Sequence, residues 1–326
     1  MNNQLSIINC QLTKDTTLNF ISLLNTVVSL FILLAVGFGA RKTGLIDDAF
    51  SKKLSSLIVK IGQPMLIISS LIALDYSAEN LRRGLIALGI SFALHTFMAI
   101  AAYFSVSWMR DLDERKLSEF AVIFTNCGFV GFPIVESLLG KEWLFCGAFY
   151  LIGFHLSLWT WGIFILSRGR EDIKLTPKKI FINYGTIPCL IGFILFIQPI
   201  ALPEFVGKTT TFLANLCTPL SLLVAGGLIA TESLREFFGR PKLYYVCAVR
   251  LLAIPLAAVL IMKLAGVPDD YLAYTAVMAA MPCASMASML GELYGIKPGY
   301  ASRLVGLSTV LCTATIPLVV WIVTII

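Results

Sequence analysis

Apolar stretches long enough to cross a lipid bilayer recur along most of this sequence. They cover residues 19–40, 54–74, 85–108, 118–139, 144–167, 181–198, 212–231, 243–264, 271–290 and 301–325. A membrane-spanning helix needs about 20 mostly apolar residues, and each stretch is close to that length. The sequence therefore predicts an all-α polytopic membrane protein with ten transmembrane helices, embedded in a lipid bilayer.

The composition agrees with a bilayer environment, since 58% of the 326 residues are hydrophobic and 13% are charged. The net charge of +6 fits basic loops beside a membrane, so no nucleic-acid partner is predicted. The longest connection, residues 168–180, is too short for a separate folded domain. The eight cysteines are far apart and lack metal-ligand spacing. Neither a metal nor a cofactor is expected.

Basic residues distinguish the two sides of the predicted membrane. The loops after odd-numbered segments contain 17 of them: Arg41, Lys42, Lys52, Lys53, Arg110, Arg115, Lys116, Arg168, Arg170, Lys174, Lys178, Lys179, Arg235, Arg240, Lys242, Lys297 and Arg303. The opposite side contains six: Lys14, Arg82, Arg83, Lys141, Lys208 and Lys263. Because short basic loops stay in the cytoplasm, we expect loop 168–180 to be cytoplasmic. Both termini should be extracytoplasmic, in a multi-pass protein of the cell (inner) membrane.

Ten segments with both ends on one side divide into two halves of five, at residues 19–167 and 181–325. An odd number of segments in each half inverts the second half relative to the first. The sequence around Pro64 in segment two resembles the sequence around Pro219 in segment seven. Matched proline-interrupted segments are typical of transporters built from inverted repeats. We therefore predict two inverted five-helix repeats.

Segments four and nine are interrupted near their middles. Residues 126–133 (NCGFVGFP) combine two glycines with a proline, and Pro282 stands within residues 271–290. Proline breaks a continuous helix but suits the first turn of a new one, so second half-helices should start at Pro133 and Pro282. Such breaks are tolerated in a membrane only where they are buried in protein or line a cavity. Matched breaks predict a transport site where the two segments cross.

The second half-helices should direct their N-termini toward each other near the bilayer centre. Helix N-termini carry free N–H groups and partial positive charge, and therefore bind anions. The predicted substrate-binding residues are Asn126, Gly128, Gly131, Pro133, Pro282, Cys283, Ser285 and Ser288. Each has a structural alternative, because Asn caps helices, prolines kink them and serines bond back to their own helix.

Ionisable residues inside the segments are candidates for coupling transport to an ion gradient. They are Glu136, one turn beyond the first break, and the only two histidines, His95 and His155. Either histidine also fits as a hydrogen-bond partner between helices. Lys60 and Arg250 are expected to snorkel toward the cytoplasm. Segment nine has no acidic residue near its break, which argues against sodium as the coupling ion.

The motifs TNCGFVGFPI in segment four and MPCASMAS in segment nine, with QPM and TPL around the aligned prolines, resemble those of the auxin efflux carrier family. That family includes the plant PIN carriers and bacterial malate and malonate permeases. The resemblance covers the whole chain. It implies crossing, broken helices 4 and 9, a scaffold of segments 1, 2, 6 and 7, and a mobile transport domain of segments 3–5 and 8–10. Without the long cytoplasmic insert of many PIN carriers, the chain resembles a short bacterial member.

These features together predict a secondary transporter for a small organic anion such as a carboxylate, acting alone or as a homodimer. Access would alternate by an elevator-like movement around the crossing of segments four and nine. An intramembrane enzyme and an anion channel are the alternatives that stay open. The sequence contains neither H-E-x-x-H nor G-x-S-x-G, so we predict that the protein is not an enzyme.

Overall fold

The computed structural model describes residues 16–73, 76–140, 142–170, 182–198, 202–230 and 239–325. Within these residues every regular element is a helix, and the extended pairing is one isolated bridge between Thr125 and Cys283. Six helical stretches are long and apolar enough to span a membrane: Asp48–Ile72, Ala78–Ser105, Trp143–Ser167, Glu204–Ile229, Pro241–Leu264 and Pro298–Val323. The prediction of an all-α, multi-pass membrane protein is confirmed.

Helices occupy all of the apolar stretches seen in the sequence. In the first half they are α2 (Thr16–Lys42), α3 (Asp48–Leu57), α4 (Gln63–Ile72), α5 (Ala78–Ser105), α6 (Leu112–Ile123), α7 (Phe132–Leu139), α8 (Glu142–Ser157) and α9 (Ile163–Ser167). In the second half they are α11 (Thr186–Ile197), α12 (Glu204–Asn215), α13 (Cys217–Ile229), α15 (Pro241–Ala248), α16 (Ile254–Leu264), α17 (Asp269–Ala280), α18 (Met286–Tyr294) and α19 (Pro298–Ile325).

Short π-helical turns interrupt several of these helices. They are η1 (Ile58–Gly62), η2 (Cys127–Gly131), η3 (Leu158–Gly162) and η4 (Val249–Ala253). Three of them come just before a proline, because Pro64, Pro133 and Pro255 are each the second residue of the helix that follows. The ring of a proline inside an α-helix collides with the carbonyl four residues earlier. A wider turn at that place relieves the collision and lets an apolar segment continue with a bend.

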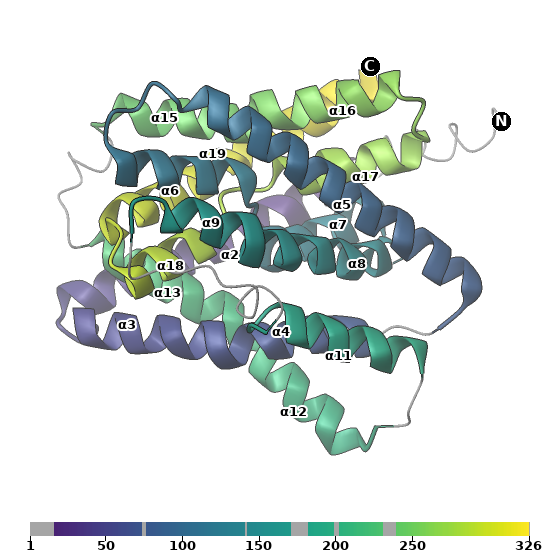
Figure 1. Cartoon of the computed structure of the whole chain (residues 1–326), viewed down its shortest axis with the longest axis horizontal. Helices are drawn as coiled ribbons and strands as arrows, with labels where there is room; N and C mark the ends of the chain where they lie inside the picture. Colours follow the sequence, from purple (N-terminus) through teal and green to yellow (C-terminus); the bar gives the residue numbers. More distant parts are fainter. Residues whose placement is uncertain are drawn as a thin grey trace.

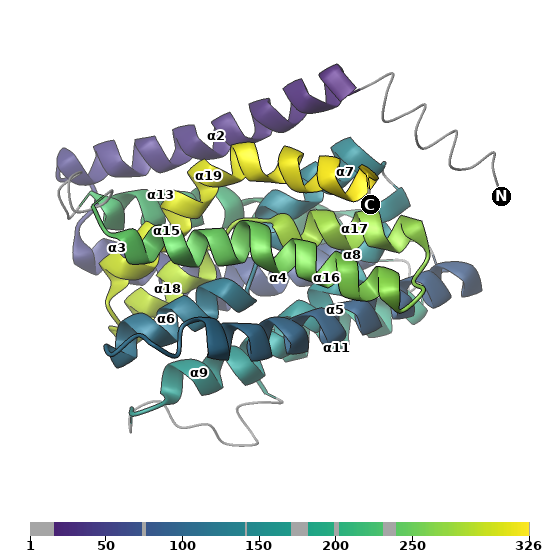
Figure 2. The same ribbon diagram turned by 90° about the horizontal axis from the view of Figure 1, so that it is seen from above.

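One group of helices consists of α2 to α4 and α11 to α13. In this group α2 packs along α13, and α4 packs against α11 and α12. Figure 1 shows α3, α4, α11 and α12 in its lower part, and Figure 2 shows α2 beside α13. The α2–α13 contact needs glycine, since a Cβ at Gly37 would lie 2.2 Å from the oxygen of Leu223 and one at Gly226 would lie 2.0 Å from that of Leu34. Small residues commonly allow such close contacts between membrane helices.

The second group surrounds the interrupted segments. In it α5 packs with α6 and α8, α16 packs with α17, and α19 packs with α6, α15, α17 and α18. The two groups meet where α13 contacts α19, α3 contacts α18 and α4 contacts α8. This division places segments 1, 2, 6 and 7 in one group and the remaining segments in the other.

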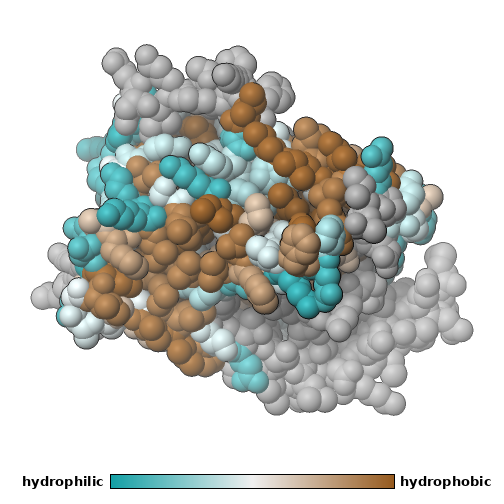
Figure 3. Space-filling view, turned by 90° about the horizontal axis from the view of Figure 1, so that it is seen from below, coloured by the Kyte–Doolittle hydropathy of each residue, from teal (hydrophilic) through white to brown (hydrophobic). Residues whose placement is uncertain are grey.

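Large hydrophobic side chains cover much of the outer surface. Leu190, Ile194, Phe205, Phe212 and Leu260 are among those that are exposed. Figure 3 shows one face on which hydrophobic residues form a broad area bordered by hydrophilic ones. Large exposed apolar areas mark contacts with a membrane or with other proteins, and this one suits contact with lipid tails.

Ion pairs at one end of the molecule join Asp111 and helix α6 to basic residues that follow segments five, seven and nine. The pairs are Lys297 with Asp111, Arg240 and Lys242 with Glu114, and Arg168 with Glu119. The charge pattern assigns all of these basic residues to the same side of the membrane. The structure therefore brings together the ends of segments that the sequence analysis grouped.

Candidate functional site

The first interrupted segment breaks a few residues earlier than predicted. Helix α6 ends at Ile123, and Phe124 leaves the helical conformation with a ψ of 118°. Helical structure resumes with η2 at Cys127, so Pro133 lies inside the continuing helix and does not start it. The π turn explains the difference, because it contains both glycines of the motif and because a wider turn before a proline lets a helix continue through it.

The second interrupted segment also resumes later than predicted. Helix α17 ends at Ala280, and Met281 takes the extended conformation, with a ψ of 150°, that a residue before proline prefers. Helix α18 begins at Met286 after Ser285, and not at Pro282. The proline therefore ends the first half of the segment, while the second half begins after a short link.

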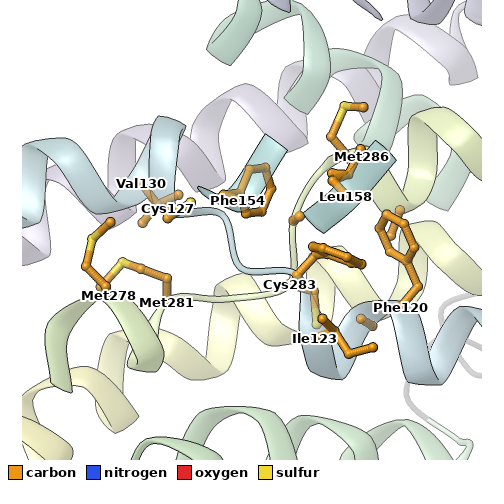
Figure 4. Close-up of a cluster of buried hydrophobic side chains, with 14 of the residues drawn as sticks. Phe120, Ile123, Cys127, Val130, Phe154, Leu158, Met278, Met281, Cys283 and Met286 are labelled. Atoms are coloured by element: carbon orange, nitrogen blue, oxygen red, sulfur yellow. The ribbon is translucent and has the colours of Figure 1, made fainter. Parts of the chain in front are cut away.

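The two links, residues 124–126 after α6 and residues 281–285 after α17, bind each other through their backbones. The N–H of Asn126 donates to the carbonyl of Pro282 at 2.8 Å, and the N–H of Ala284 donates to the carbonyl of Phe124 at 2.9 Å. Figure 4 shows the links running past each other between their helices. Backbone groups that leave a helix inside a membrane need such partners. The interruptions are thus a single paired structure where segments four and nine meet.

A small cavity lies beside this crossing, with a volume of about 20 Å³. It is lined by Gln63, Leu66, Thr125, Asn126, Gly128, Leu151, Phe154, His155, Ala284, Ser285 and Met286. These residues come from α4, α8 and both links with the helical turns that follow them. The volume suits roughly one water molecule.

Buried polar side chains from different segments meet in this cavity. The amide Nδ2 of Asn126 donates to Oγ of Ser285 at 3.1 Å, which joins the two links through side chains as well. The amide nitrogen of Gln63 lies 3.4 Å from Nε2 of His155. In the described part of the chain, the side-chain oxygens of Gln63 and Thr125 have no hydrogen-bond partner. Buried polar atoms normally have one, so these oxygens can accept from water or from the hydroxyl or protonated carboxyl of a ligand.

Four of the predicted residues line the cavity in the described part of the structure. They are Asn126, Gly128, Ser285 and His155. By contrast, Ser288 does not line the cavity. It accepts a hydrogen bond at 3.1 Å from Ser302 of α19.

The remaining residues of the two motifs serve the crossing itself. Pro282 supplies a carbonyl to the paired links, and the backbone N–H of Cys283 donates to Oγ of Ser308 at 3.0 Å. Gly131 lies against α17, since a Cβ at this position would contact Met278 at 3.5 Å.

The other coupling candidates differ from His155 in their surroundings. His95 is buried in α5, its Nδ1 donates to the carbonyl of Ser91 at 2.6 Å, and its ring lies 5.7 Å from that of Phe154. It does not line the cavity. The side chains of Pro133 and Glu136 lie outside the described part of the structure. Of the two histidines, His155 is therefore the one that lines the cavity.

Three buried residues at the site escaped the sequence analysis or were misplaced by it. Gln63 directly precedes the proline that aligns the two halves, and Thr125 directly precedes Asn126. Both signals were present in motifs already singled out. Arg250 was expected to snorkel, and this is wrong, because its side chain is 0% exposed and donates to carbonyls inside the protein.

A bundle of apolar helices, with two interrupted segments paired at its centre beside a polar cavity, has the architecture of a membrane transporter. The chain belongs to the family described as membrane transport protein, whose model matches residues 22–322. The resemblance to the auxin efflux carrier family is thereby confirmed. Like the family, this protein is a membrane transporter and not an enzyme.

Two archaeal proteins are similar to the chain over nearly its whole length. An uncharacterized transporter of Methanothermobacter thermautotrophicus is 24% identical over 92% of this chain and 98% of its own length. The uncharacterized transporter MJ1031 of Methanocaldococcus jannaschii is 23% identical over 92% of this chain and 98% of its own length.

Proposed function

We propose that this protein is a secondary transporter that carries a small organic anion, such as a carboxylate, across the cell membrane. The main observation in support is that Asn126 and Ser285, one from each link, meet in a single buried cavity. Each directly precedes a helical stretch, where N–H groups and partial positive charge favour an anion. Among the described residues that line the cavity there is no carboxylate to repel it.

The anion would replace the hydrogen bond between Asn126 and Ser285 with bonds to itself. A cavity of about 20 Å³ is too small for a carboxylate, so loading requires its walls to separate. Gln63 and Leu66 of α4 belong to the first helix group, and the other lining residues belong to the second. Movement of the second group against the first would open this cavity to one side at a time, which is an elevator-like cycle around the crossing.

The proposed architecture has ten spans arranged as inverted repeats, residues 19–167 and 181–325. The pairing of the two links supports it, because each repeat then contributes one broken segment to the same point. The ion-paired loops at one end support a common cytoplasmic side for these loops. In Figure 2, the first described turn of α2 and the last turn of α19 lie toward the same end of the molecule, which supports extracytoplasmic termini.

Proton coupling through His155 completes the proposal. His155 is the titratable side chain among the described residues that line the cavity, and it contacts Gln63 across the boundary between the two helix groups. A histidine titrates near neutral pH in water, and an anion beside it favours its protonated form. Anion and proton would therefore load together.

Proteoliposomes test this function. We expect saturable uptake of one or more members of a panel of monocarboxylates and dicarboxylates, with counterflow against preloaded unlabelled substrate and acceleration by an inward proton gradient. Uptake that does not saturate and shows no counterflow would identify a channel. Absence of uptake for every carboxylate in both orientations of the gradient would contradict the proposed substrate class.

A further inference from the structure

Arg250 is a fully buried cation without a carboxylate partner in the described part of the chain. It lies in η4, in the middle of the α15–α16 segment, with 0% of its side chain exposed. Among the described ion pairs none includes it. An isolated charge is very costly to bury, so other groups must compensate for it.

Backbone carbonyls provide that compensation. Nη2 of Arg250 donates to the carbonyl of Ala279 at 2.7 Å and to that of Met281 at 3.3 Å. Nη1 donates to the carbonyl of Val122 at 3.4 Å and also lies 3.4 Å from the sulfur of Met98. One guanidinium thus joins carbonyls from segments four and nine.

These carbonyls stand where the first halves of the two broken segments end. Val122 is in the last turn of α6, which ends at Ile123, and Ala279 is in the last turn of α17, which ends at Ala280. The last carbonyls of a helix lack intrahelical donors and carry partial negative charge. Arg250 therefore places one positive charge on two negative helix ends at once.

The crossing begins directly after these helix ends. Phe124 follows α6 and accepts from Ala284, while Pro282 follows Met281 and accepts from Asn126. Whatever holds the ends of α6 and α17 together also fixes the register in which the links pair. Residues that line the cavity come next along both links.

We propose that Arg250 is a positioning residue, a resident cation that holds the two broken segments in their crossing. Carbonyl oxygens gathered from two helix ends are the ligands that hard metal cations prefer, and the guanidinium takes the place that such an ion would need. Its planar fork can donate to several oxygens in fixed directions, which a lysine ammonium does less well. The inference rests on the proposed function only for its transport readout, since the structural readout needs no substrate.

Hydrogen exchange in nanodiscs tests the structural part. In Arg250→Ala the links should lose protection, with exchange on the order of tenfold faster in peptides that cover residues 124–126 and 282–284. Added guanidinium chloride at millimolar concentration should restore much of that protection by entering the vacated space. Lys60→Ala is the matched control, because Lys60 is an exposed basic residue in η1. Its exchange in both peptides should equal that of the parent.

Uptake in proteoliposomes should fall in the variants that lose protection and should be parent-like in Lys60→Ala. Arg250→Ala should lose uptake of the best anion by about tenfold or more, and guanidinium should restore part of it. If Arg250→Ala does not fold, Arg250→Lys and Arg250→Met replace it, and protection should fall in the order parent, Lys, Met.

Three results would overturn the inference. One is parent-like protection of both links in Arg250→Ala, and another is failure of guanidinium to restore any protection to a folded Arg250→Ala. The third is equal protection in the Lys and Met variants, which would mean that the charge has no role. If the parent carries no carboxylate but the exchange results hold, the proposed function fails and the role of Arg250 stands.

Discussion

At the scale of single residues, Asn126 has the central position in the site. Its backbone N–H donates to the carbonyl of Pro282, and its side-chain amide donates to Oγ of Ser285. Its side chain also lines the cavity. A neutral amide suits a carboxylate that has to be released again, because it offers a hydrogen bond without the strong Coulomb attraction of a buried cation.

Replacement of Asn126 by Ala should weaken anion transport strongly and leave the protein folded. A lost hydrogen bond to a charged group costs about 1.5–3 kcal/mol, which corresponds to roughly ten- to a hundredfold in KM or rate. Ser285→Ala should be milder, because backbone N–H groups remain at that helix start. Ser288→Ala is the matched control, since Ser288 bonds Ser302 outside the cavity. An effect of Ser288→Ala as large as that of Asn126→Ala would contradict the assigned geometry.

The two histidines provide a second comparison at this scale. His155→Gln should remove the acceleration of uptake at low external pH, because His155 lines the cavity and would carry the proton with the anion. His95→Gln should keep it, since His95 is enclosed among aromatic rings and does not line the cavity. The measurement is the initial uptake rate from about pH 5 to 8 for the three proteins. A parent-like pH profile in His155→Gln would exclude His155 as the coupling residue.

At the scale of elements, the sequence predicted which segments are interrupted, but it misplaced the residue at which helical structure begins again in both segments. The prolines were treated as helix starts. In the structure Pro133 continues a helix behind a π turn, whereas Pro282 ends one by forcing Met281 into an extended conformation. A proline has the same local effect in both cases, and the tertiary pairing of the links decides which outcome occurs. That pairing joins residues about 159 apart in sequence, so local propensity alone does not show it.

The capped start of α6 gives an element-scale prediction. Oδ1 of Asp111 caps this helix by accepting from the N–H of Glu114 at 3.0 Å, and Oδ2 pairs with Lys297 at 2.5 Å. Asp111→Ala should lower the free energy of unfolding by about 1 kcal/mol through loss of the cap, seen as a lower Tm in detergent. Asp111→Asn should lower the free energy of unfolding much less, because Asn also caps helices and the exposed ion pair with Lys297 contributes little.

The pH dependence of this cap has a defined sign. The hydrogen bond with Lys297 lowers the pKa of Asp111 below its ordinary value of 3.8. A lowered carboxylate pKa stabilises the folded state above the ordinary value, and that contribution is lost as the pH falls below it. The difference in Tm between parent and Asp111→Ala should therefore be constant near neutral pH. A difference that grows on acidification would contradict this assignment.

At the scale of the whole molecule, the charge bias of 17 to six basic residues fixes the expected orientation. Reporters fused to either terminus should read as extracytoplasmic, and a reporter inserted at Lys174, in a loop outside the described residues, should read as cytoplasmic. The physical reason is retention of short basic loops on the cytoplasmic side. A cytoplasmic C-terminus would make the number of spans odd and would contradict the inverted repeat.

Hydropathy predicted the all-helical, multi-pass fold because each apolar stretch must form its own hydrogen bonds in lipid. Of the residues that line the cavity, the sequence indicated Asn126, Gly128 and Ser285 beside the breaks and His155 as an ionisable residue within a segment. Gln63 and Arg250 come from other segments, and only the packing of α4 and η4 against the crossing brings them there. Their roles depend on the tertiary structure.

The central claim is that an organic anion is held between the two links, and counterflow by Asn126→Asp tests it most directly. A fixed carboxylate among these buried residues would repel a bound anion, so exchange of labelled for unlabelled substrate in proteoliposomes should fall below that of Asn126→Ala. Size-exclusion profiles establish that both variants are folded. Counterflow by Asn126→Asp as fast as that of the parent would show that the anion does not bind between these helix starts.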